Sequence, residues 1–155
     1  VGMVGPIPGT YHLVTGRLPI PEATNQQLIE SAHDSLRELD TCPEYLALLL
    51  DHGRDRLTQL VRLLCTKVTP LMYQVVTIER QDDPIHIWNM PKNRVLHLLP
   101  REGKRYAVRF YYHAKRFYPE EKSIADALEM VRNAVSFFAS MKKWYKQNND
   151  DGENH

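Results

Sequence analysis

Apolar positions follow a helical period near both ends of the chain. The first such set is Leu28, Ala32, Leu36 and Leu39. Thr24 precedes it as a candidate N-cap and predicts a helix from Thr24 to Leu39. Near the C-terminus, an apolar residue returns every three or four positions from Ile124 to Met141. This stripe predicts a helix of about 25 residues that begins near Pro119.

Two further helices are predicted in the N-terminal half. The segment TCPE has the pattern of a capping box, with Thr41 at the N-cap and Glu44 three residues later, and the helix it opens should end at Gly53. A stripe of leucines and one valine predicts another helix over residues 54–67: Leu57, Leu60, Val61 and Leu64. Together these helices suggest an N-terminal helical layer.

After Pro70 the pattern changes to alternation, which is typical of strands. Residues 73–80, 85–90, 94–99 and 105–113 form short runs rich in β-branched and aromatic residues. The segments QDDP, PKN and PREGK separate them as turns. Short connections predict antiparallel neighbours. The expected fold class is therefore α+β, with an antiparallel sheet of three or four strands and the long C-terminal helix packed on it.

The two ends differ from the middle in composition. Residues 1–21 hold four of the ten prolines and predict an extended Pro/Gly-rich arm, with one short strand at 11–14. This arm is either a loosely attached tail or a segment that docks on its own domain or on a partner. Residues 22–147 are expected to form a single globular α+β domain, and the polar residues 148–155 a disordered tail.

Overall composition is that of an ordinary globular domain, with 43% hydrophobic and 25% charged residues. No run approaches the roughly 18 apolar residues that a membrane span needs. Two cysteines, Cys42 and Cys65, are too few for a disulfide framework or a zinc site. They favour reduced thiols and an intracellular location, cytoplasmic or nuclear.

Charge is concentrated in the middle of the chain. The formal net charge is only +1, but residues 71–118 carry nine Lys or Arg residues against four acidic ones. The densest segment is GKRYAVRFYYHAKRFYP, residues 103–119. Under strand alternation, Tyr106, Val108, Phe110 and Tyr112 would face the core. The opposite face and the residues after it then form a candidate nucleic-acid-binding surface: Arg105, Arg109, Tyr111, His113, Lys115 and Arg116.

Two other interpretations of this surface stay open. Basic residues on an antiparallel sheet can simply be solvated, or paired across strands. The surface could also bind an acidic or phosphorylated protein. Trp88 and Trp144 are candidate partner-binding residues, because tryptophan is enriched at interaction hot spots, although both also fit a core role.

The predicted order of helix, sheet meander and helix is similar to the double-stranded-RNA-binding domain. The stretch LTQLVRLLCTKVTPLMYQVV, residues 57–76, resembles the first helix and first strand of that family. The family places a basic cluster at the start of its second helix, whereas here the matching place begins with Glu120 and Glu121. The predicted strand at 94–99 is also extra. The similarity is one of topology.

Sequence motifs for catalysis or metal binding are missing from the chain. There is no Gly-rich phosphate loop, GxSxG, CxxC or HExxH segment, and the seven histidines show no ligand spacing. We therefore expect a non-catalytic binding module without a cofactor. The favoured partner is nucleic acid, RNA before DNA. The alternative is a protein-interaction or assembly domain, including self-association.

Overall fold

Every secondary-structure element in the described part of the chain is a helix. The computed structural model describes residues 5–10, 21–41, 57–117 and 124–149. The helices are α1 (Asn25–Arg37), α3 (Leu57–Arg80), α4 (Pro84–Trp88), α5 (Lys92–Leu98), α6 (Arg101–Phe117) and α7 (Ile124–Asn149). The predicted α+β fold with an antiparallel sheet is therefore wrong, because all four predicted strands lie in α3 to α6. The topological similarity to the double-stranded-RNA-binding domain is lost with the sheet.

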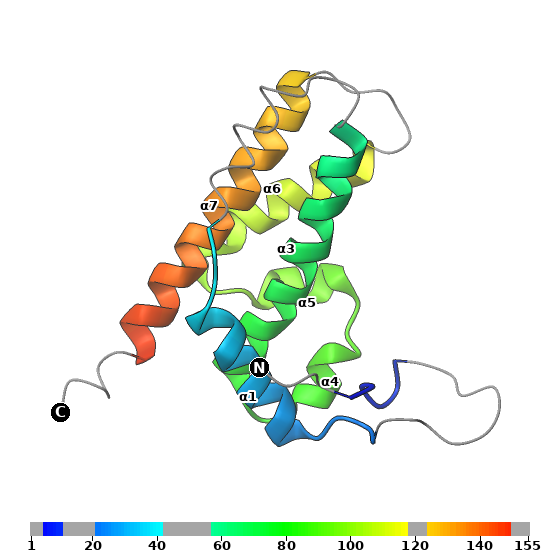
Figure 1. Ribbon diagram of the computed structural model, residues 1–155, viewed down its shortest axis with the longest axis vertical. Helices are drawn as coiled ribbons and strands as arrows, with labels where there is room; N and C mark the ends of the chain where they lie inside the picture. Colours follow the sequence, from blue (N-terminus) through cyan, green and yellow to red (C-terminus); the bar gives the residue numbers. More distant parts are fainter. Residues whose placement is uncertain (1–4, 11–20, 42–56, 118–123, 150–155) are drawn as a thin grey trace.

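Helix α3 is the centre of the fold. It contacts each of the other five described helices. Figure 1 shows α7 running beside α3, with α1 and α4 near the C-terminal end of α3. Helix α1 packs along this same C-terminal half, where the Gln74 side chain donates a hydrogen bond to Ser35 Oγ at 3.0 Å. The core is thus a set of helices arranged around α3.

Pro70 does not end this helix, contrary to the sequence prediction. One buried stripe continues across it without a change of period: Val61, Leu64, Val68, Leu71 and Val75. Pro70 itself lies on the exposed side, where water can reach the Thr66 carbonyl that loses its amide donor. Beyond Pro70 the helix is buried nearly all round, and a fully buried helix has no polar face to reveal its period.

Short helices replace the second and third predicted strands. Asp83 caps α4 by accepting a hydrogen bond from the His86 amide at 3.3 Å, and Pro84 occupies the first turn. Gln81 has φ of 53°, the left-handed conformation common just after a helix. The predicted turn QDDP does lie between α3 and α4, but the predicted turns PKN and PREGK are wrong, because Lys92 and Asn93 belong to α5 and residues 101–104 to α6. Helices α4 and α5 are only one or two turns long, too short to show a 3.6-residue period.

Helices α6 and α7 form a closely packed antiparallel pair. The residues of α6 that are buried are small or aromatic: Gly103, Ala107, Phe110 and Ala114. A Cβ atom built on Gly103 would lie 2.5 Å from Met141 Cε and 3.1 Å from Phe137 Cδ1. Gly103 therefore lets the start of α6 approach α7 more closely than a larger residue would allow.

The predictions for α1 and α7 as helices are confirmed. Thr24 caps α1 through a complete capping box with Gln27, and Leu28, Ala32 and Leu36 are buried. The helix ends at Arg37, two residues earlier than expected. Helix α7 extends to Asn149. The predicted helix between Thr41 and Gly53, Cys42, the strand at 11–14 and the segment 118–123 lie outside the described residues.

Part of the N-terminal arm contacts the domain. The Pro6 carbonyl accepts a hydrogen bond from the Ala23 amide at 2.7 Å. The Asn89 side chain donates to the Pro8 carbonyl at 2.8 Å. Gly9 has φ of +87° and lies against the same Asn89 side chain. These contacts place residues 5–10 beside the end of α4.

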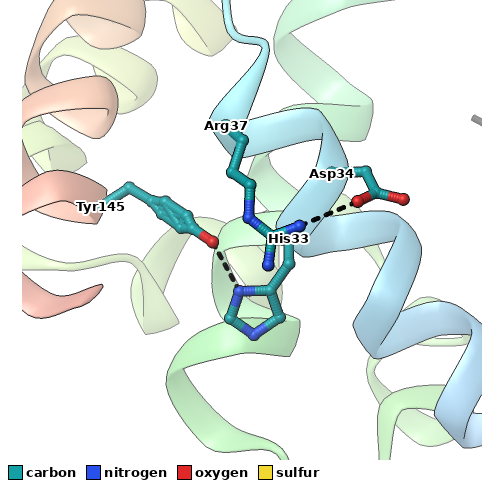
Figure 2. A network of polar contacts seen from close by, with 4 residues as sticks. All are labelled: His33, Asp34, Arg37 and Tyr145. Carbon is teal, nitrogen blue, oxygen red and sulfur yellow. Dashed lines mark hydrogen bonds and ion pairs between the residues drawn. The ribbon is translucent and has the colours of Figure 1, made fainter. Parts of the chain in front are cut away.

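A hydrogen bond to the buried Tyr145 joins the first and last described helices, α1 and α7 (Figure 2). His33 Nδ1 of α1 and the Tyr145 hydroxyl of α7 are hydrogen-bonded at 2.7 Å. Arg37 and Asp34 form an ion pair beside this bond at 3.0 Å. Burial lowers the pKa of His33, Arg37 lowers it further, and Asp34 opposes them. The neutral form of His33 is therefore favoured in the folded protein.

None of the helices in the described part of the chain combines the length and the apolar character required to span a membrane.

Gly103→Leu should destabilise the protein by about 1–3 kcal/mol, because the larger side chain must displace Met141 and Phe137. Gly103→Ala is the matched control. Its methyl group has to displace the flexible end of Met141 and shift the Phe137 ring slightly, and alanine gains helix propensity, so its stability should stay close to that of the wild type. Urea denaturation measures both. Equal stability of the leucine variant and the wild type would show that α6 and α7 are not closely packed here.

Stability should fall more steeply with acid in the wild type than in His33→Gln. The pKa of His33 is lower when folded than its ordinary value of 6.5. Below about pH 6.5 the unfolded chain therefore takes up the proton more readily, and the free energy of unfolding decreases as pH falls. Urea denaturation from pH 7.5 to pH 5 should show a flatter profile for the variant. Parallel profiles for the two proteins would contradict this account.

Candidate functional site

The exposed face of α6 carries a row of arginines. Its exposed positions include Arg101, Arg105, Arg109, Tyr112 and Arg116, at spacings of four, four, three and four residues. These spacings place them on one side of a helix, opposite the buried residues Gly103, Ala107, Phe110 and Ala114. We call the four arginines the basic row. Tyr112 lies within it.

The structure places most of the predicted surface on this helix, although the predicted strand is wrong. Arg105, Arg109, Lys115 and Arg116 are all exposed. Tyr111 is half-buried, with Lys115 Nζ 5.0 Å from the centre of its ring. His113 is also half-buried, and its Nδ1 atom is enclosed without a hydrogen-bond partner. The basic residues thus share a surface that Tyr111 and His113 only flank.

Strand alternation missed Arg101 and the exposure of Tyr112. Tyr112 was assigned to the core beside Phe110, but a helix turns it outward, and 46% of it is exposed. Lys104 is half-buried on the flank of α6 and donates a hydrogen bond to the His97 carbonyl at 3.0 Å. The sequence did contain a signal for this helix. Gly103, Ala107, Phe110 and Ala114 follow the helical spacing, but three of the four are small residues.

The segment that contains α6 has a large excess of basic over acidic residues. Residues 84–117 contain eight Lys or Arg residues and one acidic residue, Glu102. Within the described ranges, no carboxylate forms an ion pair with the basic row; the ion pair seen there is Arg37–Asp34 in α1. Arg105 instead lies over the Tyr106 ring, 4.7 Å from its centre, and donates to its hydroxyl at 2.7 Å. The row presents positive charge that the described chain does not neutralise.

Tyr111 links this surface to the hydrophobic core, against which it packs. Tyr112 and Tyr111 meet edge to face, with ring centres 5.2 Å apart. Burial, with a smaller contribution from Tyr111, raises the pKa of Tyr73 in α3. Tyr73 in turn stacks on Trp88 at 5.0 Å.

Both predicted partner-binding tryptophans take part in internal packing. Trp88 is half-buried, and its indole N–H donates to Thr77 Oγ1 at 3.1 Å. Trp144 is only 6% exposed. Neither side chain lies on the surface formed by the basic row.

The arrangement on α6 is suited to binding anions. Guanidinium groups present several N–H donors to phosphate or carboxylate oxygens. In the described ranges, no group of three His, Cys, Asp or Glu side chains is placed to hold a metal ion.

Comparison of the chain with models of protein families, with curated proteins and with solved structures finds no match.

Proposed function

We propose that this protein is a non-catalytic module that binds nucleic acid, RNA in preference to DNA, through the basic row of α6. The observation that carries the proposal is the row itself: four exposed arginines on one helix face, without a carboxylate partner in the described residues. Phosphate neutralisation by Lys and Arg supplies most of the affinity of sequence-independent nucleic-acid binding.

The dimensions of the row fit an extended chain of phosphates. Residues four apart on a helix rise by about 6 Å, so Arg101 and Arg116 are about 22 Å apart along the axis. Each guanidinium can form two parallel hydrogen bonds to one phosphate. A polyanion lying along α6 can therefore contact the whole row at once.

The exposed side of α6 fits an accessible strand of RNA. Helix α6 packs against α7, and its buried stripe leaves one side for a ligand. That side can lie along an accessible strand. Loops and ends with accessible strands are the usual targets in RNA.

An Arg105→Glu/Arg109→Glu variant should lose most of its RNA binding. If the wild type contacts about four phosphates of a single strand, its affinity should fall about 50-fold between roughly 50 and 200 mM salt. The variant contacts about two fewer, so its plot of log affinity against log salt should be shallower by about 1.4. Fluorescence anisotropy with labelled RNA and DNA oligomers at several salt concentrations measures these values.

The matched control is Arg132→Glu/Lys143→Glu, which makes the same change in charge at two exposed positions of α7. It should bind RNA nearly as well as the wild type, because its charges lie away from the basic row. Equal losses in both variants would mean that total charge, not the row, determines binding. No binding at the lower salt concentration would reject the proposal and favour an acidic protein as the partner of α6.

A further inference from the structure

We infer that the α6 surface binds unpaired nucleotides, with one base stacked on Tyr112. This inference rests on the proposed function and names the form of nucleic acid that the site accepts. It depends on Tyr112, because phosphate binding by arginines gives no reason for an exposed aromatic ring among them. Of the large hydrophobic side chains in the described ranges, only Leu63 and Tyr112 are exposed, and Tyr112 lies within the basic row.

The position of Tyr112 matches the geometry of a nucleotide. Arg109 precedes it by three residues and Arg116 follows it by four, so both lie about one helical turn from it on the same face. Arginines on either side can hold the phosphates that flank one nucleotide, while the ring between them meets its base. Every base has an aromatic face, so stacking of this kind tolerates any sequence.

The ring is supported before a ligand arrives. Tyr111 meets it edge to face at 5.2 Å, and Tyr111 is itself half-buried beneath the Lys115 ammonium. Tyr111 therefore packs against one side of the Tyr112 ring, while 46% of the residue remains accessible to solvent. A ring held on a helix by a neighbouring ring loses little conformational freedom when a base stacks on it.

Selectivity for unpaired nucleotides follows from this arrangement. In a duplex each base is already stacked between its neighbours, and its face is not available to Tyr112. Inorganic polyphosphate has the charge but no base. Both should still bind to the arginines, but neither should gain from the tyrosine. The contribution of Tyr112 to the affinity for a single strand, compared with its contribution for a duplex or polyphosphate, thus measures stacking separately from charge.

The test compares Tyr112→Ala and Tyr112→Phe with the wild type at one fixed salt concentration. The ligands are a labelled single-stranded RNA oligomer, the same RNA as a duplex, and inorganic polyphosphate as a competitor. Tyr112→Ala should weaken binding of the single strand about 5- to 100-fold. Tyr112→Phe, which keeps the aromatic face, should bind it like the wild type. Affinity for the duplex and polyphosphate should be unchanged in both variants, and circular dichroism checks that each is folded.

The outcomes separate this inference from the proposed function. If Tyr112→Ala binds single strands like the wild type, while Arg105→Glu/Arg109→Glu still abolishes binding, the protein binds phosphates without stacking and the inference is wrong. An equal loss for duplex and single strand would also overturn it, because the tyrosine would then support the surface generally. Failure of the wild type to bind any of the three ligands would reject the proposed function itself.

Discussion

Burial of the second half of α3 on nearly all sides is the constraint on which the rest of the structure depends. A proline inside a helix costs about 3 kcal/mol. Each fully buried Val, Leu or Met contributes about 1.5–3 kcal/mol, and Leu71, Met72 and Val75 all lie within five residues after Pro70. The free energy gained by keeping these side chains in register with Leu64 and Val68 therefore exceeds the cost of the proline. The polar groups within this segment are also satisfied: Thr77 donates to the Tyr73 carbonyl and accepts from Trp88.

The same burial explains which parts of the fold could be predicted from the sequence. Helices α1 and α7 have a polar side, so their period is visible, and Thr24 marks the start of α1. The second half of α3 lacks such a side, and its β-branched residues resemble a strand. In α6 the apolar stripe contains Gly103, Ala107 and Ala114, which carry little hydrophobic signal. The larger alternating residues from Tyr106 to Tyr112 therefore dominated the pattern.

The mistaken strand prediction for α6 changed only part of the candidate site, for a geometric reason. Arg105 and Arg109 are four residues apart, and such residues share a face in a strand and in a helix alike. They remained together when the predicted strand proved to be a helix. Tyr111 and Tyr112 are adjacent, so the choice of secondary structure decides which one faces outward. Charge density is a property of the sequence, whereas the identity of the exposed ring is a property of the fold.

The small residues of α6 let the helix pack closely on α7, and this packing also fixes the position of its exposed face. Because Gly103 and Ala107 allow close contact with α7, the opposite face is presented by a helix that is held along its length. A loop with the same arginines would have to be ordered by its ligand, at a cost of about 0.5–1.5 kcal/mol for each immobilised side chain. Tyr111 extends this support to Tyr112, since it packs against the hydrophobic core and meets the exposed ring edge to face. The orientation of the surface ring therefore depends on the core packing beneath Tyr111, and changes in the core there should alter binding without any change in surface charge.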